Sequence, residues 1–317
     1  MRLHRRCRSA RGRRPVRIAK LVVIGVGLMG ASCALALRSA GAVGQVVGIG
    51  RSRANLDRAL ARGAIDKALT LDDDWTREVT GADIVLIATP VAQYRSVLTA
   101  LAPALDEHTV VTDAGSTKQD VVRAARETLG SRLPRFVPGH PITGSERSGA
   151  DAADATLYVG RQVILTPLPE TAPGALARAE EFWTACGARV SRLDPERHDR
   201  ILAAVSHLPH LLAFLLVAEL VSRPDGAEYL GNAGGGFRDF TRIAASSPEM
   251  WRDITLANRD ALLTEIAAYR DALDALAMSI EHRDGTAVEA MIARAADARR
   301  RWGASGIGAV EPADSAP

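Results

Sequence analysis

Residues 18–30 read IAKLVVIGVGLMG, an apolar run that leads directly into glycines with the spacing G-x-G-x-x-G. The run has the length and composition of a buried strand, and the following SCALALRSA at 32–40 has helical periodicity. A second apolar run, QVVGIG at 45–50, and a helical pattern that ends at Gly63 come next. This order predicts a βαβ unit with a tight glycine turn between its first strand and its first helix.

The same alternation continues to about residue 193. Strand-like runs lie at 82–90, 109–115, 135–142 and 161–167, and segments with helical periodicity separate them. We therefore expect an α/β domain over 18–193 with a Rossmann-type, doubly wound and mostly parallel sheet. Strand signals stop at Pro195, and long helical patterns follow, which predicts an all-helical domain over 194–303.

The helical half carries apolar faces that are too wide for one small domain to bury. We therefore expect it to pack against a second copy of the chain and to form a homodimer. Its most apolar run, 201–221, is expected to be a buried helix and not a membrane span, because residues that are costly in a bilayer interrupt it. These residues are His207, Pro209, His210 and Glu219.

The composition is that of an ordinary globular protein, with 47% hydrophobic and 24% charged residues. The formal net charge of +3 comes from the arginines of residues 1–17, and the remainder of the chain is slightly acidic. We expect residues 1–17 to be a disordered leader, with a superficial likeness to a transit peptide, and 304–317 to be a disordered tail. No basic face follows the leader, so a nucleic-acid partner is not expected.

The 3 cysteines are an odd number and lack the spacing of metal ligands. They fit a reduced, cytoplasmic protein with neither a disulfide framework nor a metal site.

The glycine turn predicts a dinucleotide site because it follows a strand and opens a helix. Gly25 permits the tight turn, Gly27 lets the backbone approach a pyrophosphate, and Gly30 allows the helix to pack closely on the strand. Leu28 and Met29 lie in the same turn and belong to the predicted site. The alternative is a glycine-rich turn without a ligand.

The residues after the second strand bear on the choice of cofactor. An acid at this point would accept hydrogen bonds from a ribose 2′-hydroxyl, but the sequence reads GIGRSR at 48–53. Arg51 could pair with a 2′-phosphate and Ser52 could add a hydroxyl, which favours NADP over NAD. Arg51 could equally be a solvated surface group or stack on adenine. Thr89 and Pro90 end a strand beside the expected crevice, although Pro90 could simply shape a loop.

Four further motifs follow the glycine turn in order. They are DAGSTK at 113–118, GHPITGSERSG at 139–149, SHLPH at 206–210 and GGGFRDFTRIAASSPEMWRDI at 234–254. Together they closely resemble the prephenate/arogenate (cyclohexadienyl) dehydrogenase family, over nearly all of the chain from Lys20 to Trp302. The resemblance implies an NAD(P)-dependent oxidoreductase of tyrosine biosynthesis that converts prephenate to 4-hydroxyphenylpyruvate by oxidative decarboxylation. Arogenate, which would give tyrosine directly, is the alternative substrate.

By this likeness His140 and Ser116 are the catalytic residues. Oxidation of a ring C–OH needs a base for the hydroxyl proton while hydride leaves, and a neutral imidazole suits this near neutral pH. Ser116 could hydrogen-bond the same hydroxyl and the nicotinamide edge. Its alternative role is the N-cap of the helix expected to begin near Lys118.

The likeness assigns the substrate carboxylates to His210 and Arg242, since a guanidinium can hold a carboxylate with two hydrogen bonds. His207 shares a helix face with His210, and a core role suits it better than a ligand role. Glu146 matches a position that gates the pocket or pairs across it, and it could also be a solvated surface acid. Trp251 is expected at the pocket edge or the dimer contact.

Two rival functions stay open on the sequence alone. One is another two-domain dehydrogenase, of the β-hydroxyacid or 6-phosphogluconate kind, in which a lysine serves catalysis; the SHLPH and FTRIA segments argue against it. The other is a catalytically inactive NAD(P)-sensing regulator, which would bind nucleotide tightly without turnover.

Overall fold

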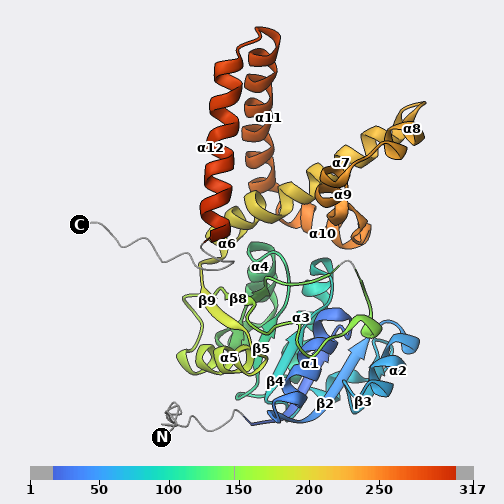
Figure 1. Cartoon of the computed structure of the whole chain (residues 1–317). Helices are drawn as coiled ribbons and strands as arrows, with labels where there is room; N and C mark the ends of the chain where they lie inside the picture. The colour runs from blue at the N-terminus through green and yellow to red at the C-terminus, as the bar shows by residue number, and fades with distance from the viewer. Residues whose placement is uncertain (1–16, 146, 305–317) are drawn as a thin grey trace, which may run out of the picture.

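The computed structural model describes residues 17–145 and 147–304. The N-terminal part is a sheet with helices on both faces, and the C-terminal part is a group of helices that reaches away from the sheet (Figure 1). The predicted fold class is therefore confirmed. The predictions for residues 1–16 of the leader and 305–317 of the tail concern residues outside the described ones.

The main sheet of the described chain has six strands, all parallel, in the order β3-β2-β1-β4-β5-β6. The order turns back at β1, so the carboxyl ends of β1 and β4 flank the crevice in which such sheets bind ligands. The strands are β1 (Ile18–Ile24), β2 (Val43–Gly50), β3 (Lys67–Thr70), β4 (Ile84–Ile87), β5 (Val110–Asp113) and β6 (Phe136–Val137).

Successive side chains of β1 enter different cores. Leu21 and Val23 pack on one face, and Val22 and Ile24 pack on the other, as the two-residue period of a strand requires. The first face is covered by α1 (Leu28–Ser39), α2 (Arg53–Ala61) and α5 (Pro173–Ala185); the second is covered by α3 (Tyr94–Leu101) and α4 (Gln119–Thr128). Burial on both faces explains why β1 is an unbroken apolar run.

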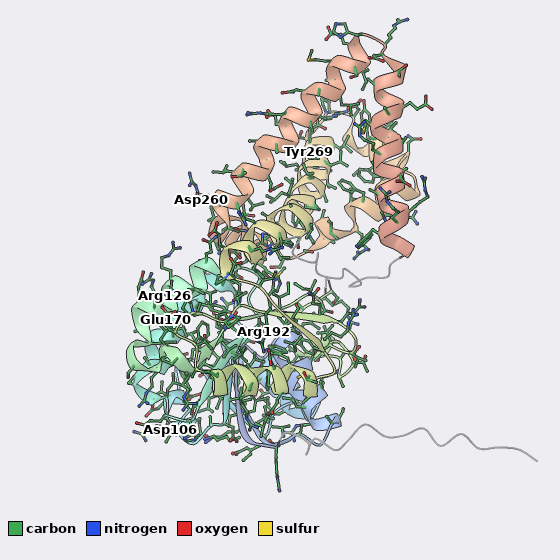
Figure 2. The ribbon with its side chains drawn as sticks, turned by 90° about the vertical axis from the view of Figure 1, so that its left-hand side faces the viewer. Asp106, Arg126, Glu170, Arg192, Asp260 and Tyr269 are labelled. Carbon is green, nitrogen blue, oxygen red and sulfur yellow. The ribbon has the colours of Figure 1, made fainter. Side chains whose placement is uncertain are left out.

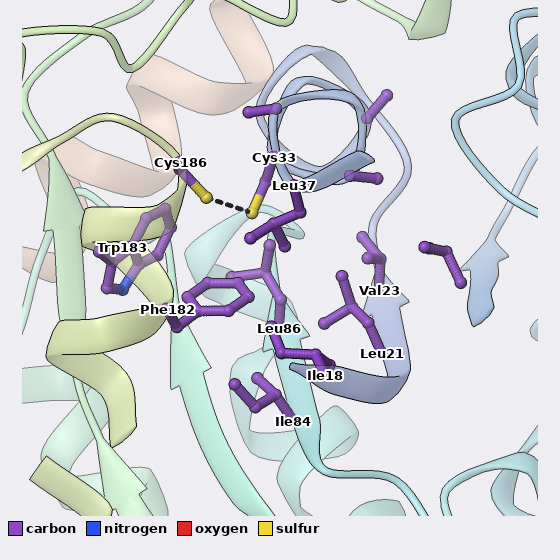
Figure 3. Packing of buried hydrophobic residues seen from close by; sticks show 14 of the residues in the cluster. Ile18, Leu21, Val23, Cys33, Leu37, Ile84, Leu86, Phe182, Trp183 and Cys186 are labelled. Atoms are coloured by element: carbon purple, nitrogen blue, oxygen red, sulfur yellow. Dashed lines mark hydrogen bonds between the residues drawn. The ribbon is translucent and has the colours of Figure 1, made fainter. Parts of the chain in front are cut away.

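The first core also joins α1 to α5. Cys33 of α1 and Cys186 at the end of α5 are buried with their sulfurs 3.5 Å apart, beside Phe182 and Trp183 (Figure 3). The helix that starts at the glycine turn is thus fixed to a helix more than a hundred residues later in the chain.

A separate sheet of three strands in the described chain differs from the sequence expectation. We expected the runs at 135–142 and 161–167 to extend the parallel sheet. The start of the first run does so as β6, but the remainder forms a sheet of order β7-β8-β9 in which the β7–β8 pair is antiparallel. Pro138 lies between β6 and β7 and has no N–H for a ladder, so the chain leaves the main sheet there. The strands are β7 (Gly139–Pro141), β8 (Gln162–Leu165) and β9 (Arg189–Arg192).

The helical part begins at Pro195, directly after β9. The expected continuous helix is interrupted by a π-helical turn, Ala203–His207, that precedes Pro209 in the first turn of α7. Proline has no N–H for the carbonyl four residues earlier, and π-turns of this kind often occur at functional sites. The helices are α6 (Pro195–Leu202), α7 (Leu208–Ser222), α8 (Gly226–Gly231), α9 (Gly235–Thr241), α10 (Pro248–Ala257), α11 (Arg259–Glu281) and α12 (Gly285–Ala304).

The expectation that 201–221 is a buried helix is wrong for the single chain. Pro195–Ser222 is long and apolar enough to cross a membrane by length and composition alone, but only 28% of its most apolar 18-residue segment is buried. A groove of about 480 Å³ lies between α7 and α11, and Figure 2 shows Tyr269 of α11 on the side where α7 lies. Leu215, Leu273 and other large apolar side chains of these helices are exposed.

Candidate active site

The glycine turn has the geometry of a phosphate-binding loop. Gly25 has φ +97°, and a Cβ there would lie 2.5 Å from the carbonyl carbon of Ala88. A Cβ on Gly30 would lie 2.3 Å from the carbonyl oxygen of Gly25, so both positions need glycine. A Cβ on Gly27 would meet nothing within 4 Å. The side of the turn at Gly27 is therefore open to a ligand.

The first turn of α1 has amide groups available for that ligand. Gly27 is its N-cap and supplies no side-chain hydrogen bond to the helix start at Leu28 and Met29. A helix N-terminus with uncapped N–H groups attracts a phosphate through hydrogen bonds and through the helix dipole. The residues present thus fit the pyrophosphate of a dinucleotide.

Asn55 holds the turn in place, and the segment at 88–90 borders it. The Asn55 side chain donates to the Val26 carbonyl (2.6 Å) and accepts from the Ala150 N–H (2.8 Å). Thr89 directly follows Ala88, which packs on Gly25, and its hydroxyl is buried with no hydrogen-bond partner in the described structure. Pro90 follows and occupies the N-cap position of the short helix Val91–Gln93. The predicted cofactor residues at 25–30 and 89–90 are thus neighbours.

The residues after β2 are already engaged in contacts. Arg51 forms an ion pair with Glu249 of α10, 3.5 Å apart, with side chains 58% and 50% exposed. The Ser52 hydroxyl accepts from the Asn55 N–H and caps α2. An exposed pair of this kind is weak, so Arg51 can exchange Glu249 for another anion at little cost.

The first and last residues of the motif at 113–118 form a buried ion pair, which the motif alone does not predict. Lys118 Nζ is 2.5 Å from Asp113 Oδ2, and both side chains are 0% exposed. Lys118 also donates to the Gly139 carbonyl, and Asp113 accepts from the Gly139 N–H and the Tyr94 hydroxyl. The pair therefore fixes the loop after β5 to the residue that precedes His140.

His140 is buried and its Nδ1 lies 2.8 Å from Nε2 of His198. His198 Nδ1 is in turn 2.8 Å from the Asp199 carboxylate, which accepts the N–H groups of Lys118 and Gln119 at the start of α4. Burial, together with the nearby His198, Lys118 and His207, holds the pKa of His140 well below its usual range. His140 is thus neutral at physiological pH, as a base must be.

A second buried histidine is connected to the same group. Asn258 donates through Nδ2 to the Asp199 backbone carbonyl (2.8 Å) and to Nδ1 of His207 (3.0 Å). Because Nδ1 accepts, the neutral ring carries its proton on Nε2, and this atom is buried without a partner in the described structure. Burial lowers the pKa of His207 to about 4. His207, expected to suit a core role, is therefore a neutral donor with its partner missing.

His210 has a different arrangement. Its Nδ1 is 2.8 Å from the Ser206 carbonyl, and its ring stacks on Trp251 with centroids 3.9 Å apart. Burial lowers the pKa of His210, and the charge of Arg242 lowers it further. The charge of Arg242 therefore reaches His210, and the assignment of both residues to a substrate carboxylate stays a prediction. The neutral His210 ring presents Nε2 as an acceptor, and it becomes a donor to a carboxylate once protonated.

Ser116 lies in the loop between β5 and α4, three residues after Asp113. Because Asp113 is hydrogen-bonded to Gly139, this loop is adjacent to the strand that carries His140. The alternative role of Ser116 as a helix cap is wrong: α4 begins after Lys118, and the Asp199 carboxylate takes the first amides. Glu146 lies outside the described residues.

Several residues of this network have no apparent motif. His198, Asp199 and Asn258 lie outside the four motifs. Lys118 ends the motif at 113–118, where the sequence predicts only the start of a helix for it. One signal could have found His198: it is four residues before Leu202 on α6 and so shares that helix's buried face. A histidine and an acid on or beside such a face need polar partners.

Comparisons with known proteins agree with this geometry. Residues 33–192 match the model for the prephenate dehydrogenase nucleotide-binding domain, and 194–293 match that for the prephenate dehydrogenase dimerization domain. The chain is 36% identical over 270 residues to the cyclohexadienyl dehydrogenase of Zymomonas mobilis, which covers 84% of this chain and 89% of that protein. It is 38% identical over 270 residues to the prephenate dehydrogenase of Bacillus subtilis, with 83% and 71% covered.

Solved structures give the same answer. Prephenate dehydrogenase from A. aeolicus, in complex with hydroxyphenyl propionate and NAD+, superposes with a TM-score of 0.84 at 34% identity and covers 91% of this chain and 99% of that one. The arogenate dehydrogenase of Synechocystis has a TM-score of 0.74 at 29% identity, with 89% and 99% covered. An open glycine turn, a buried neutral imidazole and matches along both parts of the chain lead to one conclusion: the chain belongs to the prephenate dehydrogenase family.

Proposed function

We propose that this chain is a prephenate dehydrogenase, which converts prephenate to 4-hydroxyphenylpyruvate and CO2 with NAD(P)+ as hydride acceptor. Two observations carry the proposal: the imidazole of His140 is buried and neutral next to the loop that holds Ser116, and a glycine turn at the end of β1 fits a dinucleotide. The names of its relatives support the substrate class.

In the proposed reaction Nε2 of His140 takes the proton of the ring hydroxyl. The carbon that bears this hydroxyl loses hydride, and the bound nicotinamide supplies the acceptor. The ring carboxylate then leaves as CO2, and the electrons of the broken C–C bond make the ring aromatic. The new ring oxygen regains a proton as a phenol. Ser116 hydrogen-bonds the same oxygen and orients it.

The substrate's two carboxylates and its side-chain oxygen need donors. We assign a carboxylate to Arg242 and another substrate oxygen to the Nε2–H of His207, because that donor is buried with no partner in the described residues. His210 and Trp251 form a stacked wall beside Arg242. Glu146 stays a proposed site residue, either as a gate of the pocket or as a partner across it.

For the cofactor we propose a preference for NADP over NAD. The strand end at 48–53 has no acid for a ribose 2′-hydroxyl, and Arg51 can release the exposed Glu249 for a 2′-phosphate. NAD+ is the cofactor named with the A. aeolicus relative. Replacement of Arg51 by Ala should therefore raise the KM for NADP and leave that for NAD nearly unchanged; an unaltered NADP/NAD ratio would refute this assignment.

We further propose that the chain is a homodimer through its helical part, with a division between the two parts at 193/194. The apolar groove between α7 and α11 and the exposed apolar side chains beside it support a second copy as the cover of this face. The match to a dimerization domain supports the same interface. We propose a cytoplasmic location, because the described cysteines are buried and unbridged.

Purified protein assayed with prephenate and arogenate, each with NAD and NADP, tests the proposal. We expect the rate of formation of reduced nicotinamide to be greatest with prephenate. Preferential turnover of arogenate would make the chain an arogenate dehydrogenase. Tight nucleotide binding without turnover of either substrate would favour the inactive sensor and overturn the proposal.

A further inference from the structure

Two hydrogen bonds connect His140 to Asp199 through His198, and the chemistry of Asp199 decides which atom donates in each of them. The chain of contacts runs from His140 Nδ1 to His198 Nε2, and from His198 Nδ1 to Asp199 Oδ1, at 2.8 Å each. Each histidine can donate or accept at either nitrogen, so the rings alone leave two opposite proton arrangements. The surroundings of Asp199 choose between them.

Asp199 is an acceptor at both oxygens. Oδ1 accepts the Lys118 N–H and Oδ2 accepts the Gln119 N–H, each at 2.8 Å, at the positive end of α4. With a backbone N–H donated to each oxygen at a helix N-terminus, the carboxylate is held as an acceptor and has no proton to donate. His198 must therefore donate from Nδ1. Burial lowers the pKa of His198, so the ring is neutral and its Nε2 is an acceptor.

The remaining step concerns His140. Since His198 Nε2 accepts, His140 must donate from Nδ1, and a neutral imidazole that carries its proton on Nδ1 has a free electron pair on Nε2. That electron pair is what a base needs. The opposite arrangement would place a proton on Nε2 and make His140 unable to accept the substrate's hydroxyl proton.

We propose that His198 and Asp199 are positioning residues that hold His140 in the Nδ1–H tautomer, with Nε2 ready to accept a proton. The proposal rests on the proposed function for the role of His140 in turnover, while the tautomer itself is a property of the free protein. When Nε2 takes a proton, the Nδ1–H bond to His198 becomes charge-assisted and stabilises the imidazolium. Asp199 acts through His198 and does not touch the substrate.

Two substitutions of His198 separate this role from simple packing. In His198→Gln the amide oxygen can still accept from His140, whereas His198→Phe fills a similar volume without an acceptor. We expect His198→Phe to lower kcat for prephenate by roughly 10²-fold to 10³-fold and His198→Gln by about tenfold. KM for prephenate should change by less than about threefold in both variants, since His198 acts through His140 and does not bind the substrate. His108→Phe, at an exposed histidine, is the matched control.

Nitrogen-15 NMR of histidine-labelled protein without substrate reads the tautomer directly. We expect His140 in the wild type to be protonated on Nδ1 and unprotonated on Nε2, and His198→Phe to shift it to a mixture of tautomers. A wild-type His140 with its proton on Nε2, or a His198→Phe enzyme with wild-type kcat, would overturn the proposal. If the Phe variant does not fold, the wild-type spectrum and the Gln variant decide. Failure of the proposed function is distinguishable, because inactivity of the wild type leaves the NMR result intact.

Discussion

The buried ion pair of Asp113 and Lys118 allows a quantitative test of how the site is supported. Replacement of Lys118 by Met keeps much of the side-chain volume but leaves the carboxylate of Asp113, which is 0% exposed, without its cation. Loss of one partner from a buried pair costs about 3–5 kcal/mol, because the remaining charge is uncompensated. The Gly139 carbonyl also loses the Nζ donor. We therefore predict that Lys118→Met lowers the free energy of unfolding by roughly 3–5 kcal/mol.

Denaturant unfolding at a fixed protein concentration measures this loss, since a dimer's stability depends on concentration. Lys67→Met is the matched control: Lys67 pairs with Glu78 at 2.8 Å, but its side chain is 50% exposed. It should lose no more than about 1 kcal/mol. The double variant Asp113→Asn/Lys118→Met should lose less than the sum of its single variants, because it leaves no unpaired ion. A Lys118→Met loss as small as that of Lys67→Met would refute the reasoning.

Three further predictions follow from the geometry. Gly27→Ala should change the free energy of unfolding by no more than about 0.5 kcal/mol but raise the cofactor KM at least about tenfold in kinetic assays. Gly25→Ala should also lower the free energy of unfolding by more than about 2 kcal/mol. Equal stability of the two variants in calorimetry would contradict this prediction. The pKa of folded His207 is about 4 against 6.5 for a free histidine, so the unfolded chain binds more protons below pH 6.5 and stability falls as the pH drops. Between neutral pH and pH ~4 the His207→Gln variant should therefore lose about 3 kcal/mol less of its free energy of unfolding than the wild type does. An unchanged midpoint of acid unfolding would contradict this. Leu273→Asp should convert the dimer to monomer in light scattering while Leu71→Asp does not; a dimeric Leu273→Asp protein would exclude the groove as the interface.

The fold was predictable from the sequence because its strongest signals are local. The run from Ile18 to Ile24 meets Gly25, and both the buried strand and the strained turn are properties of adjacent residues. The second sheet was not predicted, because a short strand such as β7 has no periodicity that distinguishes its pairing partner or its direction. Pro138 was the available signal, and its effect depends on which strand would lie beside it.

The site was predictable to a smaller extent. His140, His210 and Trp251 were found through motifs, and the structure places His210 and Trp251 in one stack. His198, Asp199 and Asn258 lie 51–81 residues along the chain from the motif residues they contact, and their importance arises from hydrogen bonds that form only in the folded chain. A sequence pattern describes neighbours along the chain, so it cannot describe which carboxylate caps a distant helix.

The central claim is that the neutral imidazole of His140 takes the hydroxyl proton during turnover. A comparison of kcat for wild type and His140→Asn on prephenate at saturating cofactor measures this most directly. We predict a loss of roughly 10²-fold to 10⁴-fold with a nearly unchanged KM for prephenate. A variant that keeps near-normal kcat would remove His140 from the mechanism and contradict the account.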